Sequence, residues 1–299
     1  SDFNLYAKQA QMDMFEDYFY QYNNWINRQN ARTSGTGYAD ILKSLVEVIE
    51  QFSVTNFLTQ TLANTYALPA DYYFIDKLFY YPQILSTGTN TTVTAFKLTD
   101  SAATFSNLTA PYTPPVGSII VNTTTSSECF VTNVDNPTVL SISGNIMNLN
   151  DNYVIYNNTN INEVERVSQN KIFYLTSSPL TAPSAQFPAY VLEGNTVTVY
   201  PSVIGPNVGS SVFSQWTGTS IKCQYIRYPL SPQWTFVTLA GGEPIFNNTA
   251  ASFQDFELPD SDEPALIAKI CQYVGIEIRE ADVYQFGTQE LNEETQTTT

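Results

Sequence analysis

The stretch that decides the fold runs from Ser118 to Ser143 and reads SIIVNTTTSSECFVTNVDNPTVLSIS. It holds three short runs of β-branched and other apolar residues, which are separated by a Thr/Ser tract and by an Asn-Pro dipeptide. Runs of this kind, bounded by turn residues, predict consecutive β-strands. We therefore expect strands at Ser118–Asn122, Cys129–Val134 and Thr138–Ser143.

The same pattern continues on both sides of this stretch, from about Pro69 to Tyr228. Proline, glycine and asparagine punctuate it at the spacing of a sandwich or small barrel. Glu193-Gly194-Asn195 separates two apolar runs and predicts a hairpin turn. The further strands that we expect are Thr92–Leu98, Tyr153–Tyr156, Lys171–Leu175, Ala189–Leu192, Thr196–Tyr200 and Ser220–Tyr228.

Helical periodicity replaces this pattern towards the N-terminus. Apolar residues recur at spacings of three and four from Ala7 to Arg28 and from Tyr38 to Phe52, with Ser34–Gly37 between them. This spacing places them on one helical face, and the glycines predict a short turn, so we expect a helical hairpin. A weaker helix is expected from Thr55 to before Pro69, because proline disfavours helix at the preceding residue.

Helical periodicity returns near the C-terminus. Acidic residues and Pro264 suit a first helical turn, and Leu266 and Ile270 lie on one face. Gly275 is placed to end this helix, and a second helix is expected from about Glu280. The predicted fold class is α+β, with an N-terminal helical region (1–70) and a C-terminal helix pair (241–299) flanking a β-rich middle (71–240).

Charged residues are scarce and mostly acidic. They make up 13% of the chain, against roughly 25% in ordinary globular proteins, and the formal charge is -16. Binding to DNA phosphates needs clustered bases, so sequence-specific nucleic-acid binding is not expected. Neutral polar residues dominate instead, which is typical of virion proteins and extracellular adhesins, although a compositional bias of the source organism explains it equally well.

The sequence contains no histidine, which removes Ser-His-Asp and Cys-His catalysis and the HExxH zinc motif. Gly35-Thr36-Gly37 lies between helices, without the strand that a dinucleotide site requires. Cys129, Cys223 and Cys271 are far apart and odd in number, which predicts buried free thiols. We therefore expect no enzyme, cofactor or metal. Two carboxylates would still suffice for a glycosidase, so an acidic hydrolase stays open as an alternative.

Neither a membrane span nor an export signal is predicted. The chain has no run of about 18 apolar residues and no basic N-terminal region followed by an apolar core. We therefore expect a protein that is made in the cytoplasm and does not associate with a membrane.

Tyrosine-rich stretches at Tyr18–Tyr22 and Tyr72–Tyr81 predict a core or a subunit interface, because tyrosine buries a large area and keeps a hydrogen bond. A platform for stacking sugars is the weaker alternative. Ten aromatic and aliphatic residues are the candidate interface: Tyr72, Tyr73, Tyr80, Tyr81, Trp234, Phe256, Leu266, Ile270, Tyr284 and Phe286.

Two stretches near the C-terminus carry a family resemblance. Cys223–Val237 reads CQYIRYPLSPQWTFV, and Phe253–Glu290 reads FQDFELPDSDEPALIAKICQYVGIEIREADVYQFGTQE. Both resemble the tail-ring proteins of crAss-like bacteriophages, and LPADYYFIDKL at Leu68–Leu78 resembles the segment that opens the β-rich part in that family. The likeness spans about a quarter of the chain. It is not detectable in the Thr/Asn-rich middle, where about 86–165 is a candidate phage-specific insertion.

The resemblance implies a structural virion protein, a ring or head-to-tail connector subunit at the tail or portal vertex, assembled in the bacterial host cytoplasm. Its partners would be copies of itself in a cyclic ring of about twelve, the portal protein and other tail or ring proteins. Viral DNA would pass without specific binding, since an acidic wall repels phosphates. The alternative is a virion decoration or fibre protein that binds host surface glycans, which would need an exposed aromatic groove.

Overall fold

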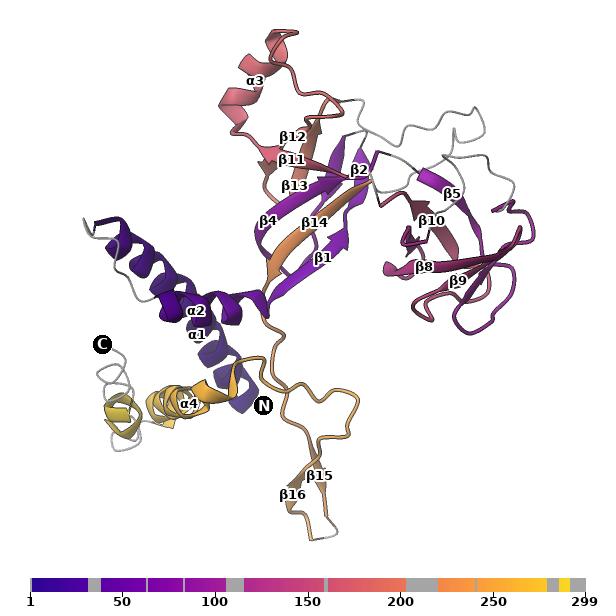
Figure 1. Cartoon of the computed structure of the whole chain (residues 1–299). Helices are drawn as coiled ribbons and strands as arrows, with labels where there is room; N and C mark the ends of the chain where they lie inside the picture. The colour runs from indigo at the N-terminus through magenta and orange to yellow at the C-terminus, as the bar shows by residue number, and fades with distance from the viewer. Residues whose placement is uncertain are drawn as a thin grey trace. The chain divides into compact units, whose positions relative to one another are not determined.

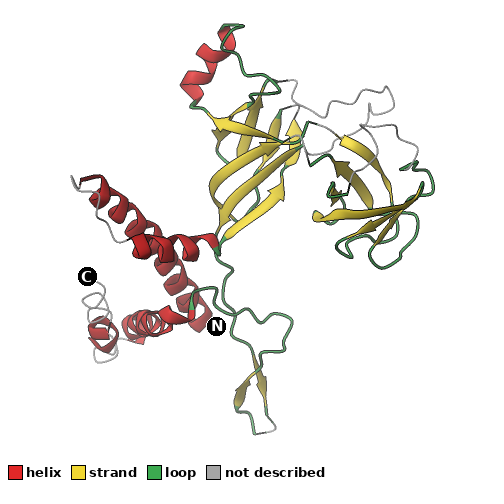
Figure 2. Ribbon diagram, viewed as in Figure 1, coloured by secondary structure: helices red, strands yellow, loops and turns green. Residues whose placement is uncertain are grey.

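The computed structural model describes residues 2–31, 39–62, 64–82, 84–105, 116–158, 161–202, 220–239, 241–278 and 285–290. The predicted α+β fold class is confirmed: an N-terminal helix, a β-rich middle with two curled half-barrel sheets, and a C-terminal helix pair that packs on the N-terminal helix (Figure 1, Figure 2). The chain forms two compact units. We call Ser1–Ser53 with Ile226–Thr299 the helical unit, and Val54–Tyr225 the β unit.

The helical unit begins with α1 (Asp2–Ala31) and α2 (Ala39–Glu50), which contact each other. The buried positions of α1 recur at spacings of three and four, which confirms the predicted amphipathic helix. Phe15 is fully buried and packs edge-on against Phe52, with ring centroids 5.0 Å apart. The predicted turn at 34–37 lies outside the described residues.

The C-terminal helices pack on α1 and on each other. A 3-10 turn, η1 (Asp260–Asp262), leads into α4 (Glu263–Ile278). The helix continues past Gly275, so the predicted end there is wrong; Gly275 is buried, and tertiary packing outweighs its weak helix propensity. Residues 285–290 are helical, and a Cβ on Gly287 would lie 2.7 Å from the Ala268 carbonyl oxygen. Glycine therefore allows this close approach to α4.

The larger sheet of the β unit has eight strands. Its spatial order is β1 (Ser53–Phe57), β14 (Ile221–Arg227), β4 (Tyr72–Tyr80), β11 (Asn162–Arg166), β12 (Ala189–Glu193), β13 (Thr196–Tyr200), β3 (Thr65–Ala67) and β2 (Thr59–Leu62). Its core includes Leu58, Tyr66, Tyr80, Val197 and Tyr225. The predicted turn between β12 and β13 is confirmed, because Glu193 pairs with Thr196 across a two-residue loop that starts with a positive-φ glycine.

The predicted third helix from Thr55 is wrong, because β1, β2 and β3 occupy this segment. Its few apolar residues fit either periodicity, and β-propensity depends on the neighbouring strands. The neighbours come from far along the chain: the Leu58 N–H donates to the Ile221 carbonyl, and Tyr66 pairs with Val197. Such non-local pairing leaves no local signal.

The predicted strand at 171–175 is also wrong, because these residues lie in α3 (Gln169–Ser177). The helix connects β11 to β12, which are parallel neighbours. Parallel strands need a crossover connection of a dozen or more residues, which is usually helical. Ile172 and Leu175, one helical turn apart, pack against Ala189 and Val191 of β12.

The smaller sheet has six strands that come from one continuous segment. Its spatial order is β5 (Ile84–Thr89), β10 (Asn152–Tyr156), β7 (Ile119–Asn122), β8 (Ser127–Asn136), β9 (Val139–Ile142) and β6 (Lys97–Thr99). The three strands expected between 118 and 143 are confirmed. β5 was not predicted, and the strand expected from 92 is confined to β6. The whole sheet lies in the chain between β4 and β11, which pair with each other.

The central strands β7 and β10 are buried on both faces. One face, with Ile120, Tyr153 and Ile155, fills the core of the smaller sheet. The opposite face joins a cluster that includes Phe57 and Tyr156, whose rings stack with centroids 4.9 Å apart. This cluster therefore joins the two sheets of the β unit.

Candidate interaction surfaces

Two of the predicted interface tyrosines lie inside the β unit. Tyr80 is 2% exposed and Tyr81 is 4% exposed, and burial, with Tyr66 nearby, raises the pKa of Tyr80 to about 12. Tyr72 and Tyr73 are half-buried, and Tyr72 packs against the same core as Tyr80. The structure therefore places one face of this strand in the core and leaves Tyr80 and Tyr81 no surface for another molecule.

Three further candidates form the contact between α4 and α1. Leu266 is buried against Ala10 and Met14, and Phe256 and Ile270 pack around the same cluster. These three residues pack the C-terminal part of the helical unit against α1 of the same chain. Of the other C-terminal candidates, Phe286 is exposed, and Tyr284 lies outside the described residues.

Glu257 links the stretch Cys223–Val237 to the stretch Phe253–Glu290. Its carboxylate accepts two hydrogen bonds from the Arg227 guanidinium, at 2.8 and 2.7 Å, and a third from the Leu230 N–H, at 2.7 Å. Hydrogen bonding to Arg227 lowers the pKa of Glu257 below its ordinary value of 4.5. Paired, two-point bonding of this kind fixes orientation as well as distance.

Gln11 of α1 forms hydrogen bonds to both stretches, at Leu230 and at Glu257. Its side chain is 1% exposed, and its amide Nε2 donates to the Leu230 carbonyl at 2.7 Å while its Oε1 accepts from the Glu257 N–H at 3.1 Å. A buried amide with both ends satisfied is a specific contact. Gln11 thus fixes the chain to α1 at Leu230 and at Glu257, on either side of the segment between them.

That segment, residues 233–254, is what we call the hairpin arm. An isolated bridge closes its base: the Gln233 N–H donates to the Gln254 carbonyl at 2.8 Å, and the return bond is 3.3 Å. Beyond the base lie β15 (Phe236–Thr238) and β16 (Pro244–Phe246), which form a two-stranded sheet with no further strand among the described residues. Figure 1 shows the two strands extending away from α1 and α4.

The hairpin arm is apolar and exposed. Phe236, Val237, Leu239, Ile245 and Phe246 are each 51 to 53% exposed, and every residue of β15 and β16 is exposed. Two-stranded hairpins are marginally stable alone in water, and apolar patches on a protein surface mark interaction sites. The arm is therefore the best candidate for an interaction surface in the helical unit.

Aromatic rings run along the hairpin arm from its base. Trp234 stacks on Phe236 with ring centroids 5.4 Å apart, and Phe3 of α1 meets Trp234 edge-on at 6.5 Å. Phe236 pairs with Phe246 in the register of the hairpin, and Phe246 meets Phe253 edge-on at 5.5 Å. Of the ten predicted residues, Trp234 is the one that belongs to this surface.

A second apolar surface lies on what we call the α3 segment, residues 168–188. Phe173, Tyr174, Leu180 and Phe187 are 73 to 95% exposed, whereas Ile172 holds the helix to β12. Side chains that are this exposed contribute little to the core of the β unit, so packing within the chain does not account for these large apolar residues. The α3 segment is therefore the matching candidate surface in the β unit.

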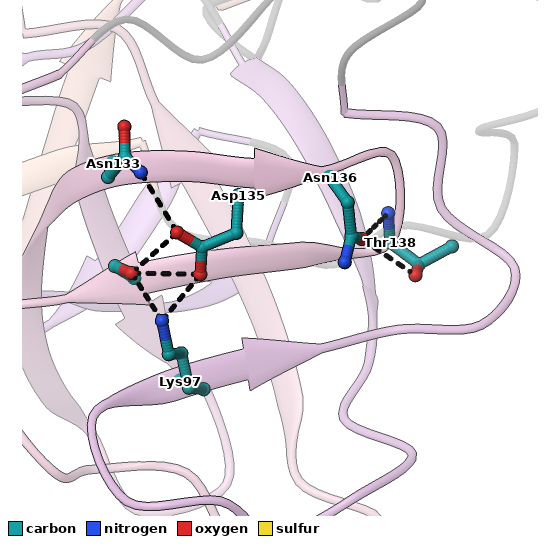
Figure 3. Close-up of polar contacts among 6 residues, drawn as sticks. Lys97, Asn133, Asp135, Asn136 and Thr138 are labelled. Atoms are coloured by element: carbon teal, nitrogen blue, oxygen red, sulfur yellow. Dashed lines mark hydrogen bonds and ion pairs between the residues drawn. The ribbon is translucent and has the colours of Figure 1, made fainter.

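A cluster of charged and polar side chains lies on the smaller sheet (Figure 3). Asp135, in a β-bulge, accepts from Lys97 at 2.5 Å, from Ser141 at 2.9 Å and from Asn133 at 2.9 Å. Hydrogen bonds from Lys97 and Ser141 lower the pKa of Asp135, which makes it a weaker base. Since Lys97 and Asp135 occupy β6 and β8, on either side of β9, the cluster clamps the edge strand β6.

The buried cysteines are held in the thiol form. Burial raises the pKa of the Cys129 thiol to about 11 and that of Cys223 to about 12, so both stay unreactive thiols. Both are buried as predicted, and Cys271 is half-buried. The described residues include no group of three potential metal ligands and no helix long and apolar enough to cross a membrane.

Both surfaces were missed by sequence reasoning, although the hairpin arm left a signal. Apolar runs flank Gly241-Gly242-Glu243, which is the pattern of a hairpin turn, and Gly242 adopts a φ of 84°. The α3 segment left none, because its apolar residues fit a strand as well as a helix.

Comparison with known protein families finds no family that matches the chain. No curated protein gives a significant match either.

Proposed function

We propose that the protein is a structural subunit of a tailed-phage virion that assembles with copies of itself into a ring in the head-to-tail or tail region. The proposal starts from the resemblance to crAss-like phage ring proteins. The ring would contact the portal protein and other tail or ring proteins and form part of the conduit for viral DNA.

The observation that carries this proposal is the exposed hairpin arm on an anchored base. The Arg227–Glu257 ion pair, at 2.7 Å, and the buried Gln11 fix where the arm leaves the helical unit. An anchored base that carries an exposed, apolar and aromatic hairpin suits a subunit contact, since aromatic residues dominate the energetics of protein interfaces. The arm also lies between the two stretches that carry the resemblance.

Charge supports the same proposal. At a formal charge of -16, copies repel one another, so a stable contact needs a surface nearly free of charge. Residues 233–254 hold one charged residue. The stretch from Asp255 to the end carries 11 of the 28 carboxylates, and we propose that such acidic walls let DNA pass without trapping it.

Electron microscopy of the purified protein, and of virions that contain it, tests the proposal. We expect rotationally symmetric rings in solution at high protein concentration, and a ring of matching diameter at the vertex that bears the tail. A protein that stays monomeric and is found on capsid faces or fibres would contradict it.

A decoration or fibre protein that binds host glycans is the second candidate. Phe96 and Phe130 are exposed on the smaller sheet, and Phe96 has a strained φ of 57°. The Ser143 hydroxyl accepts from the Phe130 N–H, and the Ile142 N–H donates to the Phe96 carbonyl, so both aromatics lie near one end of β9. Binding of the monomer to a glycan array, lost in Phe130→Ala, would favour this candidate.

A further inference from the structure

A ring is built from heterologous contacts, in which one patch of a subunit meets a different patch of the next. The chain presents two such patches. The hairpin arm offers a narrow, two-stranded surface, and the α3 segment offers a helix and loop with highly exposed side chains. Because the two surfaces differ in shape, we consider a contact between the hairpin arm of one copy and the α3 segment of another, and not a contact between two identical surfaces.

The charges on these two surfaces are complementary. Glu243 is the single charged residue among residues 233–254, and Lys171 is the single charged residue among residues 168–188. Both are exposed. Among the described residues neither forms an ion pair. Each segment therefore carries a single charge, and the two charges are of opposite sign.

We infer that the hairpin arm of one copy docks on the α3 segment of a neighbouring copy, with Glu243 facing Lys171. The contact rests on the proposed self-assembly and specifies its surfaces. Apolar burial by the aromatic residues supplies the affinity, and the charge pair selects the orientation. Docking also gives the arm the packing partner that a two-stranded hairpin lacks in water.

Charge reversal tests the pairing in the full-length protein. Sedimentation velocity at low salt measures self-association of wild type, Glu243→Lys, Lys171→Glu and the double variant. We expect each single variant to raise the apparent dissociation constant about tenfold, since an attraction is replaced by a repulsion. The double variant restores the pair in reverse and should return to within about twofold of wild type.

Net charge alone predicts a different result. Glu243→Lys changes the formal charge from -16 to -16 + 2 = -14, which by itself reduces repulsion between copies and strengthens association. Glu16→Lys, at an exposed position of α1, makes the same change and is the matched control. Weakening by Glu243→Lys, with no weakening by Glu16→Lys, therefore identifies a local contact.

The possible outcomes separate this inference from the proposed function. Wild-type protein that stays monomeric over the whole concentration range overturns both. Rings that form equally well from Glu243→Lys overturn the arm contact and leave self-assembly standing. Weakening by both single variants without recovery in the double variant would show that the two charges contact other surfaces, which also overturns the pairing.

Discussion

The strand β4 and the hairpin arm are both rich in aromatic residues, yet one is core and the other is surface. In the sequence, Tyr72–Tyr80 reads YYFIDKLFY, and the arm strands read FVT and PIF. β4 lies between β14 and β11 in an eight-stranded sheet, whereas β15 and β16 form a sheet of two strands in the part of the chain that the structure describes. Aromatic content therefore does not decide burial: Tyr80 faces the core of its sheet, whereas Phe74 of the same strand and Phe236 of the arm face solvent.

Truncating a tyrosine of β4 should have the largest effect on stability. Tyr80→Ala removes a fully buried ring, and we expect the free energy of unfolding to fall by about 3–5 kcal/mol, as for other large aromatics. Denaturant unfolding of the purified protein measures this. Tyr174→Ala, at a side chain that is mostly exposed on α3, is the matched control and should change stability by less than about 0.5 kcal/mol. A similar loss in both variants would refute the comparison.

Removing the anchor of the hairpin arm should have an intermediate effect. Glu257→Gln loses the charge-assisted hydrogen bonds from Arg227, and we expect the free energy of unfolding of the helical unit to fall by about 1.5–3 kcal/mol. Glu163→Gln is the matched control, because Glu163 forms a looser, more exposed pair with Lys77 at 3.4 Å. That pair is worth about 0–1 kcal/mol. Equal effects would show that Glu257 is not a structural anchor.

The anchor should also weaken in acid. Since the pKa of Glu257 is lowered in the folded protein, its contribution is present above the unfolded value of about 4.5 and is lost as pH falls through the folded pKa. The stability difference between wild type and Glu257→Gln should therefore stay constant from about pH 7 to pH 5 and shrink below that. Denaturant unfolding across this range measures it. A difference that grows in acid would contradict the assigned ion pair.

Changing an exposed aromatic residue of the hairpin arm should have the smallest effect on folding and the clearest effect on assembly. Phe236→Ser removes a half-exposed ring that stacks on Trp234, so we expect the free energy of unfolding to fall by about 0.5–1.5 kcal/mol. Self-association should weaken more than about tenfold, as at interface hot spots. Leu62→Ser, on the exposed strand β2, controls for surface hydrophobicity. Unchanged association of Phe236→Ser in sedimentation velocity would remove the arm from the interface.

Sequence patterns predicted the elements that have strong local signals. The alternating runs from Ser118 to Ser143 became β7, β8 and β9, the Gly194 turn became a hairpin, and the spacing from Ala7 became α1. The amphipathic pattern of α4 was found as well, although its end was placed at Gly275 instead of Ile278. These features succeed because periodicity and turn chemistry depend on neighbouring residues alone.

The errors share one cause, which is competition from distant parts of the chain. The segment from Thr55 became strands because β14 and β13 offered partners, and residues 171–175 became helical because parallel β11 and β12 needed a crossover. Tyr80 and Tyr81 of the candidate interface are buried for the same reason, because distant segments pack over them. Trp234 was identified, but the hairpin that carries it was not.

By itself, the sequence determined the α+β class, the acidic and charge-poor character, the absence of histidine chemistry and the two free thiols that are buried. These follow from composition and local periodicity. Only the tertiary structure decided which aromatic residues face solvent, that β5 to β10 form one sheet between paired strands, and that Arg227, Glu257 and Gln11 anchor an apolar arm. Burial and side-chain pairing depend on which distant segments meet, and that information is not local.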